Sequence, residues 1–94
     1  MKEWTKSNID NQKYIGVLEF QDNKGEFHNF EVIHTTTRLV FGGMCNIGFL
    51  ESGYMEIDYS FSLDENLQEL LSDLETYYNE GKEYVSRIVC NERM

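Results

Sequence analysis

The sequence predicts an α+β fold: an antiparallel β-meander of about five strands with one amphipathic helix packed on it. A C-terminal strand is one of two alternatives for the tail. Three observations predict this fold. Segments rich in β-branched and aromatic residues alternate with turn residues, and one capped segment has helical periodicity. The 94 residues suffice for a single domain, residues 1–94, with one modest core. Residues 1–12 are mostly polar and are predicted to form a loose N-terminal arm.

The first two strands are predicted to form a hairpin. Residues 14–20 (YIGVLEF) and 26–34 (EFHNFEVIH) flank the sequence QDNKG, which fits a type I turn with Gly25 in the left-handed region. The resulting register pairs Leu18 with Phe30, Phe20 with His28, Gly16 with Val32, Tyr14 with His34 and, next to the turn, Asp22 with Glu26. These pairs form the more apolar face. The opposite face is also partly apolar, so we expect the helix to cover it.

Three further strands are predicted downstream, at residues 38–41, 46–50 and 54–61. The pair Gly42-Gly43 is predicted to end the first of them, and Ser52-Gly53 fits a tight hairpin turn before the last. Residues 54–61 alternate in polarity as a half-buried strand does. Their apolar face is predicted to consist of Met55, Ile57, Tyr59 and Phe61.

The helix has the clearest local signals. Ser62 and Glu65 form a capping box, with Ser62 as the N-cap residue and Glu65 at the third helical position. Gly81 is a natural stop signal after the last turn. One apolar stripe at helical spacing consists of Leu63, Leu67, Leu70, Leu71, Leu74, Tyr77 and Tyr78. Residues 84–90 (YVSRIVC) fit either a strand or a short helix, and their β-branched residues favour a strand.

Charge is the most informative feature for function. The net charge is −9, and residues 39–81 contain nine carboxylates but no Lys or Arg. Without bases between them, these carboxylates are expected to repel one another or to meet a group from outside. Eight basic against 17 acidic residues, with no basic stripe, argue against direct nucleic-acid binding. The same charge disfavours anionic membranes.

The expected compartment is the cytoplasm. No apolar run approaches the roughly 18 residues that span a bilayer. The N-terminus also lacks the apolar region of a secretory signal. The two cysteines, Cys45 and Cys90, form no CxxC motif, as expected for reduced thiols inside a cell.

One candidate chemical site is a thiol. Cys45 follows Gly42-Gly43 in a predicted loop, and His28 and His34 lie on one strand face, which suggests a thiol-dependent or small-ligand module. A buried cysteine and two strand-edge histidines are the simpler interpretation, because no group that would orient a Cys–His pair is evident.

Three other patterns suggest a particular chemistry but lack a feature that this chemistry requires. Oxygen-bearing side chains occupy EF-hand positions at Asp58, Ser60, Ser62, Asp64, Asn66 and Glu69, but Leu63 stands where the loop requires glycine. The glycines of residues 41–49 match neither the P-loop nor the dinucleotide-binding motif, and no helix follows them that could hold a phosphate at its N-terminus. Glu56 and Asp58 share a solvated strand face, so a raised pKa is not expected. We therefore expect no metal, no cofactor and no enzymatic activity.

The acidic surface itself is the best functional candidate. Carboxylates spaced i,i+4 on a helix lie about 6 Å apart, close to the spacing of phosphates along one nucleic-acid strand. Such a surface fits the basic groove of a nucleic-acid-binding protein, and aromatic residues would anchor it. The predicted partner-binding residues are Glu56, Asp58, Glu65, Glu69, Asp73, Glu75, Glu80 and Tyr54.

In length, acidity and lack of a catalytic motif, the chain resembles small acidic inhibitors of phages and mobile elements, such as anti-CRISPR and DNA-mimic anti-restriction proteins. The resemblance rests on the base-free stretch of residues 39–81. It implies a non-enzymatic inhibitor of a nucleic-acid-binding protein, for example a host defence nuclease. The alternatives are the thiol or ligand module and a housekeeping adaptor that self-associates through sheet edges and exposed aromatics. Homo-oligomer formation therefore stays open.

Overall fold

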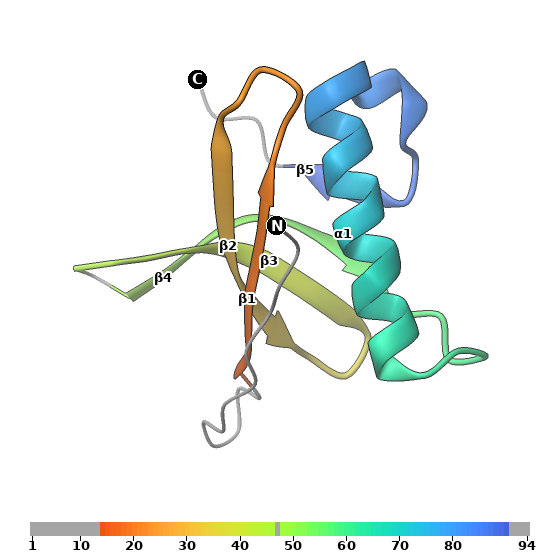
Figure 1. Ribbon diagram of the computed structural model, residues 1–94. Coiled ribbons are helices and arrows are strands. Elements are labelled where there is room, and N and C mark those ends of the chain that lie inside the picture. The colour runs from red at the N-terminus through yellow and green to blue at the C-terminus, as the bar shows by residue number, and fades with distance from the viewer. Residues whose placement is uncertain (1–13, 47, 91–94) are drawn as a thin grey trace.

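In the computed structural model, which describes residues 14–46 and 48–90, five antiparallel strands form one sheet in the order β1-β2-β3-β4-β5 (Figure 1). One helix packs on it, which confirms the predicted α+β meander. The predicted N-terminal arm lies outside the described residues. The elements are β1 (Tyr14–Gln21), β2 (Phe27–His34), β3 (Arg38–Cys45), β4 (Gly48–Glu56), α1 (Leu63–Glu80), the 3-10 turn η1 (Lys82–Tyr84) and β5 (Ile88–Cys90).

The β1–β2 hairpin has the predicted turn and nearly all of the predicted register. Gly25 has φ +89°, and its N–H donates to the Asp22 carbonyl over 3.0 Å. The cross-strand pairs include Gly16–Val32, Leu18–Phe30 and Phe20–His28. Tyr14, however, pairs with Ile33 instead of His34, because a bulge shifts the register between Tyr14 and Gly16.

The predicted boundaries of the next strands are wrong. Gly42-Gly43 does not end β3, which continues to Cys45, and Ser52-Gly53 lies inside β4. The chain reverses between Cys45 and Gly48 instead. A bulge between Phe41 and Gly42 of β3 places Ser52 as an extra residue in β4. Glycine is needed at positions 42 and 53 because a side chain there would collide with the backbone of a neighbouring strand, and not because the chain turns there.

The last predicted strand is also too long, because β4 ends at Glu56. Met55 is buried and Ile57 packs against the core, as expected. Tyr59 and Phe61, however, are 68% and 55% exposed, since the chain has left the sheet and turns toward the helix. The alternation of residues 57–61 therefore does not reflect a strand.

Helix α1 forms as predicted. Ser62 Oγ accepts a hydrogen bond from Glu65 N over 3.1 Å, and Glu65 Oε1 accepts one from Ser62 N over 2.8 Å. Both halves of the capping box are thus present. Gly81 caps the other end with φ +119°. The helix buries the leucine stripe in a core with residues from all five strands, namely Ile15, Leu18, Phe20, Val32, Leu39, Phe41, Met55 and Ile88.

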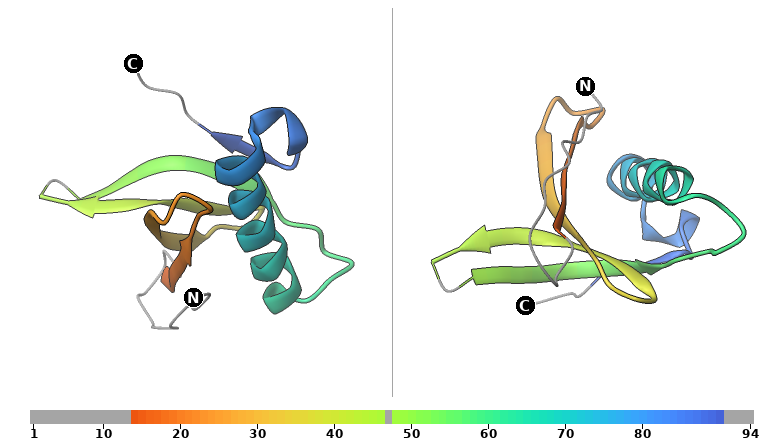
Figure 2. Two further views of the ribbon diagram at one scale, coloured as in Figure 1. Left: turned by 45° about the horizontal axis from the view of Figure 1, so that its top comes forward. Right: turned by 90° about the horizontal axis from the view of Figure 1, so that it is seen from below.

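The helix covers the face of the first hairpin that bears Leu18 and Phe20, and not the opposite face, for which we expected it. Bending of the sheet makes this possible. The β1–β2 and β3–β4 hairpins extend in different directions, and α1 lies beside the first hairpin and β5, on the side away from the tip of the β3–β4 hairpin (Figure 2). Of the two alternatives for residues 84–90, the structure has the strand, because Ile88–Cys90 form β5, which pairs with Gly53–Met55 of β4. The 3-10 turn η1 precedes this segment and shares only Tyr84 with it.

Candidate functional site

The loop of residues 57–62 is fixed by one buried amide. Asn66 is only 1% exposed, and its Oδ1 accepts a hydrogen bond from Asp58 N over 2.9 Å. Its Nδ2 donates to the carbonyls of Asp58 and Ser62 over 3.0 and 2.8 Å. Asp58 in turn accepts hydrogen bonds from the Ser60 hydroxyl and backbone N–H, which lower the pKa of Asp58. The loop is therefore held against the first turns of α1.

This loop and the outer face of α1 form a surface that we call the helix–loop surface, defined by Tyr59, Phe61, Asp64, Glu65, Gln68 and Glu69. A pocket of about 330 Å³ lies on it and is lined by Phe61, Asn66 and the four helix residues of this surface. An exposed aromatic ring thus stands beside three carboxylates. Such a lining is suited to an arginine or lysine side chain, which stacks on the ring and pairs with the acids.

Two arginines from outside the base-free stretch neutralise part of it. Arg38 Nε lies 3.4 Å from Glu56 Oε2, because the β3–β4 register places the two residues opposite each other. Arg87 Nη1 lies 3.0 Å from Glu69 Oε1. The expectation that these carboxylates have no counterion within the chain is therefore wrong for Glu56 and Glu69, and also for Asp73, which lies 3.9 Å from Arg87 Nε. Both pairs are half exposed, so each contributes little to stability.

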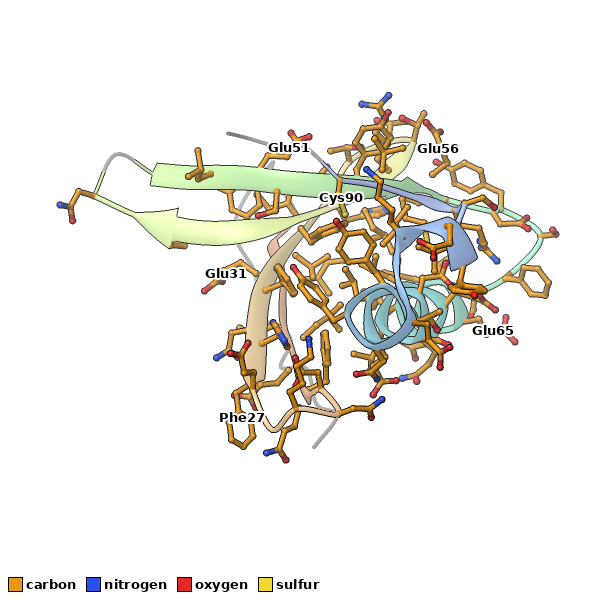
Figure 3. All side chains as sticks on the ribbon, turned by 90° about the horizontal axis from the view of Figure 1, so that it is seen from above. Phe27, Glu31, Glu51, Glu56, Glu65 and Cys90 are labelled. Carbon is orange, nitrogen blue, oxygen red and sulfur yellow. The ribbon has the colours of Figure 1, made fainter. Side chains whose placement is uncertain are left out.

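The eight predicted partner-binding residues do not form one surface. Met55 points into the core, so its strand neighbours Tyr54 and Glu56 point to the other face of the sheet, away from α1. The Arg38 guanidinium lies 3.8 Å above the centre of the Tyr54 ring. Figure 3 shows Glu56 and Glu65 on different sides of the strands.

On the helix, the predicted acids divide into two groups. Glu65 and Glu69 line the pocket described above. Asp73 and Glu75 are partly covered, and Glu80 is exposed on the last turn. Asp58 accepts hydrogen bonds within the loop. Sequence reasoning therefore found Glu65 and Glu69 but missed Phe61, because its place in an apparent alternation assigned it to the core.

Asp73 is the one acid of this group whose charge is disfavoured by its surroundings. Its side chain is 18% exposed, and within the described residues Oδ2 has no hydrogen-bond donor. Burial raises the pKa of Asp73, against the opposing effect of Arg87, whose Nε lies 3.9 Å from Oδ2.

We expect Asp73→Asn to be more stable than the wild type at pH 7, by about 0.5 kcal/mol. A raised pKa means that the folded state holds the proton of Asp73 to a higher pH than the unfolded state does. The charged carboxylate thus costs stability above this raised pKa, and the cost vanishes below the unfolded value of about 3.9. Urea unfolding at pH 7 and pH 3 measures the difference. A less stable variant at pH 7 would mean that attraction to Arg87 outweighs burial.

The backbone places the residues of the predicted thiol site in different parts of the sheet. Gly42 and Gly43 belong to β3 and not to a loop, and the backbone of Cys45 ends that strand at the tip of the β3–β4 hairpin. His28 lies beside the turn of the other hairpin, which extends in a different direction (Figure 2). The side chain of Cys45 is outside what the structure describes.

In the described part of the chain, α1 is not apolar enough to cross a membrane, and no other helix is as long. No protein-family model matches the chain, and neither curated proteins nor solved structures gave a significant match.

Proposed function

We propose that the chain is a non-enzymatic interaction domain that binds the basic surface of a nucleic-acid-binding protein and competes there with nucleic acid. In its most concrete form it is a phage-encoded inhibitor of a host defence nuclease, as anti-CRISPR proteins are. The contact is made by the helix–loop surface, and not by the wider set of acids that runs onto the sheet.

The pocket of about 330 Å³ on this surface is the observation that supports the proposal most. Proteins that bind nucleic acid expose arginine and lysine. An arginine that enters the pocket would bring its guanidinium beside the Phe61 ring and the carboxylates of Asp64, Glu65 and Glu69, the last of which it would share with Arg87. Stacking and charge-assisted hydrogen bonds would then act together. The rest of the acidic surface would steer such a partner over longer range.

The test compares two double variants with the same change in net charge. Glu65→Gln with Glu69→Gln removes two of the three carboxylates that line the pocket, and glutamine at position 65 keeps the capping box. Glu19→Gln with Glu31→Gln is the matched control, because both residues lie on β1 and β2, away from the helix–loop surface. The tagged wild type captures partners from nuclease-treated host lysate, and the captured protein is then purified.

We expect the purified partner to bind DNA or RNA and to lose it when the wild type is added. The pocket variant should bind the partner about tenfold more weakly, and the control variant should bind as the wild type does. Binding should also weaken at high salt. Equal loss in both variants would show that only total charge matters. A partner with no affinity for nucleic acid would contradict the inhibitor proposal.

A second candidate, a self-associating adaptor, is favoured by the β3–β4 hairpin, where Met44 and Leu50 are exposed. Light scattering on the purified chain separates the two candidates. A dimer that captures nothing from lysate supports the adaptor, and a monomer that captures a basic partner supports the inhibitor.

A further inference from the structure

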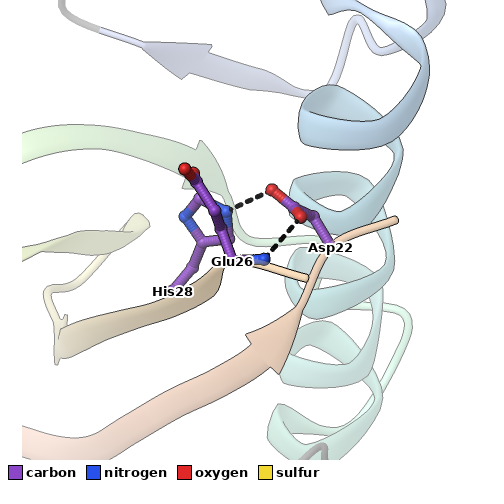
Figure 4. A group of neighbouring side chains, drawn as sticks. All are labelled: Asp22, Glu26 and His28. Atoms are coloured by element: carbon purple, nitrogen blue, oxygen red, sulfur yellow. Dashed lines mark hydrogen bonds and ion pairs between the residues drawn. The ribbon is translucent and has the colours of Figure 1, made fainter. Parts of the chain in front are cut away.

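The turn of the β1–β2 hairpin brings together three side chains that are all metal ligands in proteins. Asp22 follows β1, Glu26 precedes β2, and His28 is the second residue of β2 (Figure 4). Each offers one ligand atom, and these atoms lie within 4.8 Å of one another. The cluster lies beside the C-terminal end of α1, because Asn23 N donates to Asn79 Oδ1 over 2.8 Å. The helix–loop surface is at the other end of this helix.

Two of the three ligands are held in place by the fold. Asp22 Oδ1 accepts hydrogen bonds from the N–H groups of Lys24 and Glu26, both over 2.9 Å, which leaves Oδ2 directed at His28. The His28 ring stacks on Tyr78, with ring centroids 4.2 Å apart, and is only 16% exposed. The hydrogen bonds to Asp22 are of the kind that orient metal-binding carboxylates in proteins.

We propose that Asp22, Glu26 and His28 form a three-ligand site for a divalent transition-metal ion, for which Zn²⁺ is the best candidate. One imidazole and two carboxylates are ligands that zinc accepts, and a water molecule would supply the fourth ligand. Calcium and magnesium prefer oxygen ligands alone, so the histidine argues against them. Two carboxylates also balance the charge of the ion.

The spacing requires little adjustment. Two ligands at about 2.0–2.1 Å from one zinc ion, at the tetrahedral angle, lie about 3.3 Å apart. Asp22 Oδ2 and His28 Nε2 are already 2.8 Å apart. The ion would replace the proton that these two atoms share, and the His28 proton would then reside on Nδ1. Glu26, on an exposed and flexible side chain, would complete the set by a change of rotamer.

The experiment is a calorimetric titration of the full chain with ZnCl₂ at pH 7.5, together with the thermal unfolding midpoint with and without the ion. We expect one ion per chain and a higher midpoint in its presence. His28→Asn should weaken binding at least tenfold, and His34→Asn is the matched control because it removes the other histidine of the same strand. Glu26→Gln should weaken binding without changing the midpoint of the metal-free protein, so a loss in this variant is not a folding defect.

Two results would overturn the site. One is the absence of any heat or midpoint shift with ZnCl₂ at a tenfold molar excess. The other is one-to-one binding that persists in both His28→Asn and Glu26→Gln, which would place the ion elsewhere, for example on the cysteine thiols. Neither result bears on the helix–loop surface, so this proposal stands apart from the proposed function.

Discussion

Gly53→Ala is expected to lower the free energy of unfolding by about 3 kcal/mol. Gly53 lies in β4 between β3 and β5. A Cβ built on it overlaps the carbonyl oxygen of Val89 and lies 2.7 Å from Phe41 Cζ, in the core. Backbone of a paired strand cannot move aside as the end of a side chain can, so the methyl group would push β5 away from β4. Urea unfolding followed by circular dichroism measures the loss.

The chain offers a matched control one strand away. A Cβ on Gly43 meets nothing within 4 Å, so Gly43→Ala is expected to leave stability unchanged or to raise it by about 0.5 kcal/mol. Gly42→Ala should resemble Gly53→Ala, because its Cβ overlaps the Leu50 carbonyl oxygen. If Gly43→Ala and Gly53→Ala cost the same, general strand propensity and not close approach would explain both.

These glycines also show where prediction from the sequence ends. Glycine serves both at turns and where two backbones approach closely. Asn-Lys-Gly at residues 23–25 is a turn, and its neighbours in sequence identify it as one. Gly42-Gly43 and Ser52-Gly53 have no such neighbours. Their role depends on the strands beside them, and the bulge that sets the β3–β4 register is not a local property of either segment.

Local signals were sufficient for the helix and for the first hairpin. The capping box, the leucine stripe and Gly81 all act within a few residues, and each is present as predicted. The turn around Gly25 in turn fixed the pairing of Phe20 with His28. The cluster of Asp22, Glu26 and His28 could also have been predicted from the sequence. The predicted register pairs Asp22 with Glu26, and His28 lies two residues further on the same strand face.

The candidate binding surface was predictable only in part. Glu65 and Glu69 follow from helical spacing, and Phe61 does not, because its exposure depends on where β4 ends. The pairing of Arg38 with Glu56 depends on the β3–β4 register, and that of Arg87 with Glu69 depends on how the tail packs on α1. A charge count along the chain misses both ion pairs, since the partners are distant in sequence.

Asn66→Ala is expected to lower the free energy of unfolding by about 3 kcal/mol, although it removes only one small side chain. The amide is buried, and it satisfies the Asp58 N–H and the carbonyls of Asp58 and Ser62. Alanine would leave the Asp58 N–H without its acceptor, and a buried unsatisfied group costs about 1–3 kcal/mol. The two carbonyls would each lose one hydrogen bond and keep another, from the N–H groups of Phe61 and of residue 66. Urea unfolding measures the loss. Chymotrypsin should also cleave after Tyr59 and Phe61 faster, because the loop is no longer tied to α1.

Asn79→Ala is the matched control for this prediction. Asn79 is exposed on the same helix, and its amide oxygen accepts one hydrogen bond from Asn23 N. Since water can replace that bond, we expect a loss of no more than about 1 kcal/mol and no faster cleavage in the loop. If the two variants lost stability equally, burial of Asn66 would not matter. If Asn66→Ala lost stability while cleavage stayed slow, the loop would be held by other contacts, and Phe61 would keep its place on the helix–loop surface without this amide.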